Sequence, residues 1–223
     1  MTLADGNRTD VEQRWREAVL SGGWVKLGSG QTAADDPAHG AEWGPERTVS
    51  AAVLADVLRS AYESKKPRAL RLDGARITGQ LDLEATTLAC PLVLRGCWFE
   101  EPIVLAEASA PAVRLWRCWL PGLEARQLTT SGNLELADGS TVTGKVCLLG
   151  AHIGGILALS SATLTNPGGP ALNGDGLTVD GDMFCREGFR ATGEVRLPGA
   201  HIGGILEFSQ ATLSNPGGPA ERR

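Results

Sequence analysis

Apolar and small residues along most of this chain occur in pairs two positions apart, and the pairs recur every five or six residues. The stretch after residue 102 shows the pattern clearly, with the pairs Ile103/Leu105, Ala108/Ala110, Val113/Leu115, Cys118/Leu120 and Leu123/Ala125. A spacing of two places both members of a pair on one face of an extended strand. A recurrence of five or six residues is too short for a strand plus a hairpin loop. The pattern therefore predicts a coiled chain in which each pair forms one short side of a coil.

Four such sides make a coil of about 22 residues, and the sequence itself tests this length. Steps of about one coil from residue 75 meet a column of mostly small residues: Ala75, Cys97, Cys118, Ser140, Ala162, Phe189 and Ala211. The positions two residues later form a mostly aliphatic column: Ile77, Phe99, Leu120, Val142, Leu164, Ala191 and Leu213. In one coil the sizes are reversed, with the large Phe189 in the small-residue column and the small Ala191 in the aliphatic column. The one long step contains "TNPGGP", which predicts an inserted loop.

The columns over residues 67–213 resemble the pentapeptide-repeat superfamily, whose signature places a small residue two positions before a central Leu or Phe. The block "LRLDGARITGQLDL" is similar to blocks in a group of actinomycete β-helix proteins. Many sides here have six residues, and the Asp or Asn expected before the central residue is mostly missing. We expect an all-β solenoid, specifically a right-handed quadrilateral β-helix with about 22 residues per coil. The best-studied members of the superfamily mimic DNA and bind gyrase.

The first 66 residues lack this pattern and predict two amphipathic helices. "TDVEQRWREAVLSGG" begins with Thr9 as a candidate N-cap, and Glu12 completes a capping box. "SAAVLADVLRSAYES" predicts a second helix over residues 50–64, and the stretch between the two reads as a loop. We expect an α-helical cap over residues 1–66 and the β-helix over 67–223. The chain stops where another coil would begin, which predicts either a short covering tail or an end-to-end homodimer.

Composition narrows the classes of function. The 223 residues are 42% hydrophobic and carry a net charge of −5, which disfavours a general nucleic-acid binder. No apolar run reaches the roughly 20 residues that span a membrane, and the polar first residues lack a signal sequence. We therefore expect a cytoplasmic protein with no membrane span.

The segment "GAHIGGIL" occurs at 150–157 and again at 199–206, which raises the possibility of a duplicated histidine site. His152 and His201 lie between inward residues and should point outward. Two coils separate them, about 10 Å, so the pair cannot share one metal ion. Thr178, a poor ligand, is expected between them. We expect no metal and no cofactor.

The five cysteines include no CxxC pair, so neither a disulfide framework nor a zinc finger is indicated. Cys97, Cys118 and Cys185 are expected to be buried and inward. Cys147 is expected to point outward and is the cysteine to test for reactivity. Motifs of nucleophile elbows, phosphate-binding loops and zinc proteases are absent from the sequence.

The most unusual surface feature is aromatic. Trp98 and Trp119 occupy equivalent outward positions on adjacent coils, where their rings can stack. With Trp116 at the nearby corner and neighbouring arginines, they give six candidate binding residues: Trp98, Trp116, Trp119, Arg76, Arg95 and Arg117. Exposed aromatic and arginine side chains are typical of interaction sites. The alternative is that the N-terminal segment, which carries Trp15, Trp24 and Trp43, folds over this patch.

Three functions are consistent with these observations. The first is a non-catalytic interaction scaffold that contacts a protein partner or a small molecule through the Trp/Arg face. The second is a gyrase-binding DNA mimic that confers self-resistance, which needs a continuous acidic face. The third is an enzyme that acts on a small molecule, with its site on the solenoid face or under the helical cap.

Overall fold

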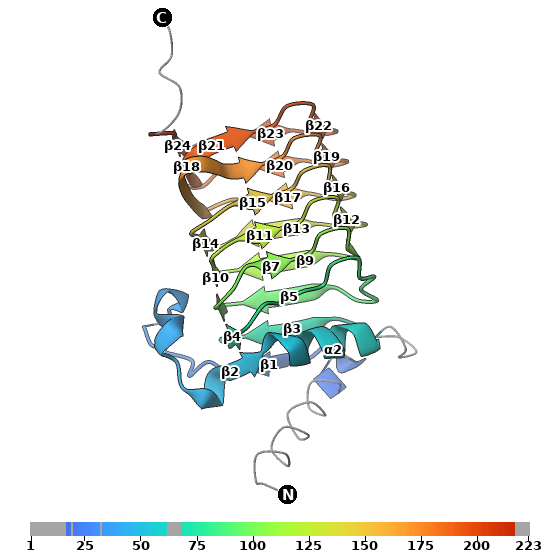
Figure 1. The fold of residues 1–223 in the computed structure, drawn as a ribbon, viewed down its shortest axis with the longest axis vertical. Coiled ribbons are helices and arrows are strands. Elements are labelled where there is room, and N and C mark those ends of the chain that lie inside the picture. The colour runs from blue at the N-terminus through green and yellow to red at the C-terminus, as the bar shows by residue number, and fades with distance from the viewer. Residues whose placement is uncertain (1–16, 19, 32, 62–67, 217–223) are drawn as a thin grey trace, which may run out of the picture.

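The computed structural model describes residues 17–18, 20–31, 33–61 and 68–216, and it shows a β-solenoid of about six turns with about 22 residues per turn. Figure 1 shows the turns stacked one on another from the N-terminal end to the C-terminal end. All strands pair in parallel with strands of the neighbouring turns. The predicted solenoid and its coil length are therefore confirmed.

Three parallel sheets form the sides of the solenoid. The first sheet contains, in order, β1 (Trp24–Lys26), β3 (Leu70–Asp73), β5 (Leu92–Arg95), β9 (Val113–Trp116), β13 (Leu134–Ala137), β17 (Leu157–Ala158), β20 (Met183–Phe184) and β23 (Leu206–Glu207). The third sheet contains β8 (Ser109–Ala110), β12 (Thr129–Thr130), β16 (His152–Ile153), β19 (Thr178–Val179) and β22 (His201–Ile202).

The second sheet has two arms that meet at the long strand β18 (Thr163–Asn173). One arm contains β2 (Thr48–Ser50), β4 (Arg76–Thr78), β6 (Trp98–Phe99), β10 (Trp119–Leu120) and β14 (Thr141–Val142). The other arm contains β7 (Ile103–Val104), β11 (Leu123–Glu124) and β15 (Val146–Cys147). Strand β21 (Arg190–Arg196) pairs with β18 and with β24 (Thr212–Ser214).

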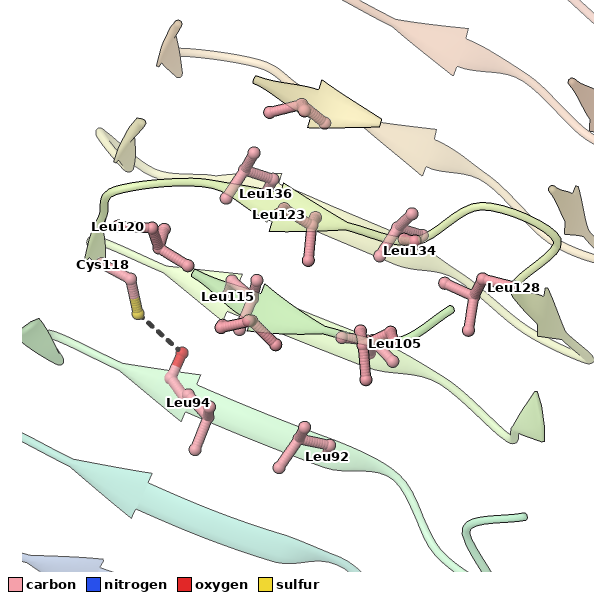
Figure 2. Close-up of a cluster of buried hydrophobic side chains, with 14 of the residues drawn as sticks. Leu92, Leu94, Leu105, Leu115, Cys118, Leu120, Leu123, Leu128, Leu134 and Leu136 are labelled. Atoms are coloured by element: carbon pink, nitrogen blue, oxygen red, sulfur yellow. Dashed lines mark hydrogen bonds between the residues drawn. The ribbon is translucent and has the colours of Figure 1, made fainter. Parts of the chain in front are cut away.

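The two predicted columns lie inside the solenoid in the predicted register, up to the last turn, where Leu213 is exposed. The strand pairs Ile77/Phe99, Leu120/Val142 and Val142/Leu164 are direct Cα partners. In the small-residue column, Ala75, Cys97, Cys118, Ser140, Ala162 and Phe189 are all buried. Figure 2 shows leucines from successive turns pointing into one core, where the Cys118 thiol donates to the Leu94 carbonyl at 3.5 Å. Apolar pairs are thus buried by stacking of turns, as expected for a solenoid.

The predicted inserted loop "TNPGGP" is not a separate loop. It lies within β18, which pairs with β21 on both sides of a register shift between Thr165 and Pro170. Asn166 Nδ2 donates to the Pro170 carbonyl at 2.9 Å and closes the extra residues into a bulge. The insertion therefore lengthens one strand locally and leaves the pairing of the coils intact.

The repeated segment "GAHIGGIL" is explained by stacking. Gly150 and Gly199 have positive φ angles of 62° and 68° and form the coil corner before the third sheet. The adjacent glycines Gly154 and Gly155 follow strand β16, where the backbone of one turn lies directly on the backbone of the turn before it. A Cβ on Gly155 would overlap Asn133 Oδ1 and come within 2.8 Å of the Gly132 carbonyl carbon. The glycines are thus required by the close approach of successive turns.

The segment before residue 67 contains strands as well as the expected second helix. Helix α2 (Ala51–Ala61) lies within the predicted 50–64, and its side chains Leu54, Val57 and Leu58 are buried. Strand β1 pairs with β3 and β2 pairs with β4, so this segment extends two sheets of the solenoid. The pairing satisfies backbone groups that the first predicted coil would otherwise leave unpaired. The predicted first helix lies mostly outside the described residues.

Two short 3-10 helices complete this segment, η1 (Pro37–Glu42) and η2 (Pro45–Arg47). They occupy the stretch that the sequence predicted as a loop. Figure 1 shows this segment, drawn in blue, beside the first turns of the solenoid. Within the described ranges, no helix has the length and apolar character that a membrane crossing requires.

Candidate functional site

The stacked tryptophans are present as predicted, but one of them is covered. Trp98 and Trp119 are register partners, and their ring centroids lie 5.7 Å apart with an interplanar angle of 14°. Trp98 is only 9% exposed. Helix η1 packs on it so closely that a Cβ on Gly40 would overlap the Cβ and Cγ atoms of Trp98. The alternative in which the N-terminal segment folds over the patch therefore applies to Trp98, while Trp119 remains half-buried.

Arg76 also serves the contact between the N-terminal segment and the solenoid. Its guanidinium lies 5.6 Å from the Trp98 ring centroid, and its Nη1 donates to the Trp43 carbonyl at 3.2 Å. Trp43 is itself buried beneath the guanidinium of Arg47, 3.5 Å from its ring centroid. Arg76 and Trp98 thus hold the N-terminal segment in place, and Trp15 lies outside the described residues.

Arg95 and Trp116 lie on the first sheet in one column of register partners. The column runs from Lys26 through Asp73 and Arg95 to Trp116. Arg95 Nη2 lies 2.6 Å from Asp73 Oδ2, and the guanidinium lies 4.4 Å from the centroid of the Trp24 ring. The hydrogen bond with Asp73 raises the pKa of Arg95. Arg95 is therefore a fixed cation, clamped between a carboxylate and an aromatic face.

Trp116 is oriented by a carboxylate on the next strand. Its Nε1 donates to Glu135 Oε2 at 2.8 Å, and Arg114 Nε donates to the other oxygen of the same carboxylate at 3.0 Å. Burial acts to raise the pKa of Glu135, but the hydrogen bonds from Asn133, Arg114 and Trp116 outweigh it and lower the pKa. The half-buried Trp116 ring is therefore held by an ionised partner.

Arg117 stands at the corner between the first and second sheets. Its φ angle is +51°, and the same corner holds a positive-φ residue in the neighbouring turns, Gly74, Gly96 and Asp138 among them. Within the described part of the chain, the exposed Arg117 side chain makes no hydrogen bond or ion pair. We name the surface formed by Arg95, Trp116, Arg117 and Trp119 the Trp/Arg corner.

A pocket of about 350 Å³ lies between the N-terminal segment and the Trp/Arg corner. Its lining is charged and glycine-rich: Lys26, Gly28, Gly30, Asp35, Asp73, Gly74, Arg95, Gly96 and Arg117. Arg95 and Arg117 are predicted site residues, whereas Lys26, Asp35 and Asp73 were not predicted. A signal for the position of Lys26 was present in the sequence. Val25 and Leu27 on either side of it repeat the spacing of two seen in the coils, and both pack on the core.

The two repeated histidines lie on the third sheet. His152 and His201 pair on either side of Thr178, as predicted, and His152 Nε2 lies 3.0 Å from Asp180 Oδ1. No three His, Cys, Asp or Glu side chains among the described residues are grouped so as to hold a metal ion.

All five cysteines are buried and unbridged. Burial raises the pKa of Cys185 to about 12, which removes thiolate character at neutral pH. The expectation that Cys147 is accessible is wrong, because the residue is only 4% exposed. Its small side chain lies between strand partners Glu124 and Asn173.

Comparisons of this chain with protein-family models, with curated proteins and with solved structures find no match. The function of the Trp/Arg corner is therefore inferred from its geometry alone.

Proposed function

We propose that this protein is a non-catalytic β-solenoid interaction scaffold that binds its partner at the Trp/Arg corner. One observation carries the proposal: the exposed Arg117 side chain has no partner within the described residues. It stands at the corner of its turn, and the half-buried residues Trp116 and Trp119 lie on either side of it in the sequence. Arginine and tryptophan dominate binding energy at protein interfaces. A surface held by stacked turns loses little conformational freedom on binding, which favours affinity.

The carboxylates of the pocket support binding over catalysis. Asp35 accepts hydrogen bonds from the backbone N–H groups of Ser29 and Gly30 and from Arg47. Partial burial acts to raise the pKa of Asp35, but these hydrogen bonds and the Arg47 charge outweigh it and lower the pKa. Asp73 is engaged by Arg95. The lowered pKa makes Asp35 a weak general base, and the Asp73 carboxylate is occupied by Arg95. The pocket itself keeps a small-molecule enzyme as the second candidate.

We also infer kinship with the pentapeptide-repeat proteins, on the support of the small-then-aliphatic columns. The DNA-mimic function of that superfamily needs a continuous acidic face. Arg71 and Arg114 occupy outward positions along the first sheet, on either side of Val93. These cations interrupt such a face and favour the scaffold over the mimic.

The scaffold proposal is tested by photo-crosslinking in the native host. A photoreactive amino acid at position 119 is expected to give a defined adduct with one partner, and the adduct should be lost in Arg117→Glu. The matched control places the photoreactive residue at position 178, an outward position on the third sheet. Failure to form an adduct at 119, identical adducts at 119 and 178, or an adduct that survives Arg117→Glu would contradict the proposal.

We further propose that two copies stack end to end through the last turn. Ile205, Leu206 and Leu213 are exposed there, beside β22, β23 and β24, whose outer edges pair with no strand among residues 68–216. The edge of a parallel sheet presents both donors and acceptors, so two identical edges can pair while burying this apolar surface.

Sedimentation velocity at high micromolar concentration tests the dimer. We expect a dimer for the wild type and a monomer for Leu213→Asp, which places a charge on the 51% exposed residue. Leu149→Asp is the control, since Leu149 is similarly exposed at 44% but does not lie in the last turn. A monomeric wild type, or a dimer that survives Leu213→Asp, would remove the stacking proposal.

A further inference from the structure

The pocket beside the Trp/Arg corner carries more positive than negative charge, in a protein whose net charge is −5. Three cations line it, Lys26, Arg95 and Arg117, against the two carboxylates of Asp35 and Asp73. Asp73 is paired with Arg95, and Asp35 is paired with an arginine behind the pocket wall. Lys26 and Arg117 make no ion pair within the described ranges, so two positive charges remain uncompensated.

The arginine behind the wall is Arg47, whose side chain is 8% exposed. Its Nε donates to the Gly74 carbonyl at 2.9 Å, and its Nη1 contacts Asp35 Oδ1 at 2.8 Å. Its Nη2 is buried without a hydrogen-bond partner and lies 3.1 Å from the point that a Cβ on Gly74 would occupy. The charge of Arg47 is offset by Asp35, but its buried Nη2 is an unused donor next to a glycine that lines the pocket.

Two lining glycines leave room for a ligand to approach the backbone. A Cβ on Gly96 would meet no atom closer than 3.5 Å and a Cβ on Gly30 would meet none within 4 Å, whereas the space beside Gly74 is filled by the Gly28 backbone. In the two turns at the pocket, the positive-φ corner position is occupied by Gly74 and Gly96. In the next two turns, the same position is occupied by Arg117 and Asp138. Side chains are therefore absent from the corner only where the N-terminal segment faces it. Gly28 also lines the pocket, and its N–H donates to no other described residue.

We infer that this pocket binds a dianionic phosphoryl group, and the inference rests on the proposal that the Trp/Arg corner is a binding surface. Lys26 and Arg117 balance the two negative charges, and Arg95 supplies a planar donor fork already oriented by Asp73 and Trp24. Strands β1 and β9 are three strand steps apart, about 14 Å at the usual spacing, so the long Lys26 and Arg117 side chains can converge on one group.

The pocket volume of about 350 Å³ also accommodates the group that bears the phosphate. That group is either a small phosphorylated metabolite or a phosphorylated side chain of a protein partner. Both present the same chemistry to the pocket, so the experiment includes one probe of each kind.

Isothermal titration calorimetry at low salt tests the inference on the full chain. The probes are inorganic phosphate, glucose 6-phosphate, a phosphoserine peptide, the unphosphorylated peptide and glucose. We expect saturable binding of at least one phosphorylated probe that weakens as salt is added, and no binding of glucose or the unphosphorylated peptide. Tighter binding of the sugar phosphate identifies a metabolite site, and tighter binding of the phosphopeptide identifies a partner site. No binding of any phosphorylated probe overturns the inference.

Variants locate the site. Lys26→Gln and Arg117→Gln should each weaken binding about tenfold or more, the usual effect of losing a charge-assisted hydrogen bond. Gly96→Asp should abolish binding while the chain still folds, because Asp138 occupies the same corner position at a φ of +56°. Arg190→Gln is the control, since Arg190 is another exposed arginine and lies on β21, five strand rows beyond Arg76.

Equal weakening in Arg190→Gln, or unchanged binding in both Lys26→Gln and Arg117→Gln, contradicts the assignment to this pocket. The result also separates the two proposals. If crosslinking at position 119 depends on Arg117 but no phosphorylated probe binds, the corner is a partner surface and the phosphoryl inference is wrong. If a phosphorylated probe binds and no adduct forms, the scaffold proposal is wrong and the pocket stands as a small-molecule site.

Discussion

Replacing Phe189 by alanine is expected to destabilise the solenoid by about 3–5 kcal/mol. Phe189 is fully buried and is the one large residue in a column whose other members are small. The turns above and below are fixed by backbone pairing, so they cannot collapse into the space that the ring leaves. The cost therefore combines the lost burial with a cavity, and urea unfolding of the wild type and variant measures it.

The size exchange within this coil provides the control. Adding Ala191→Leu to Phe189→Ala restores the small-then-aliphatic order of the other coils, since Ala191 pairs with Leu164 and Leu213. Because the total volume is nearly kept, we expect the double variant to unfold within about 1.5 kcal/mol of the wild type. A double variant no more stable than Phe189→Ala would show that the two positions do not share one space.

Replacing Gly40 by alanine is expected to release helix η1 from the solenoid. The added Cβ would overlap Trp98, whose own position is fixed by stacking on Trp119. Overpacking of this kind costs about 1–3 kcal/mol, and here the cost falls on the contact between the N-terminal segment and the first turns. Faster amide hydrogen exchange over residues 38–43 and a more exposed Trp98 should follow.

Gly44→Ala is the matched control for this prediction. The atoms nearest to its Cβ would be those of the Glu46 carboxylate, the far end of a flexible side chain, and Gly44 has a φ of −74° that alanine adopts readily. Exchange over residues 38–43 should be unchanged in this variant. Equal effects of the two substitutions would argue that η1 is not held by its contact with Trp98.

The regularity of the coils explains why so much of the fold could be predicted. Each inward position repeats about every 22 residues, so the six steps between seven positions all test one coil length. A wrong coil length would have mixed Arg76 or Trp98 into the apolar columns. The stacking of Trp98 on Trp119 followed from the same arithmetic, because register partners on parallel strands must lie side by side.

The candidate site was less predictable because it is formed by parts that do not repeat. Lys26 reaches the pocket through the pairing of β1 with β3, which joins residues 47 positions apart and leaves only a three-residue strand as a signal. Trp98 is covered by a 3-10 helix that can approach it only because residue 40 is glycine. In a sequence, a glycine within a polar stretch is normally interpreted as a turn, so this contact could not be predicted. Cys147 showed that an outward position can still be buried when its neighbours are larger.

The strictly sequential stacking of the turns has a consequence for biosynthesis. Within residues 68–216, each turn pairs only with the turn before it and the turn after it. A nascent chain leaving the ribosome can therefore complete one turn and immediately offer it as a template for the next. Only the N-terminal segment must wait for later residues among the described parts of the chain, because β1 pairs with β3 and η1 packs on Trp98. At every stage of elongation, the unprotected apolar surface is then limited to the single most recent turn, which keeps the opportunity for aggregation small.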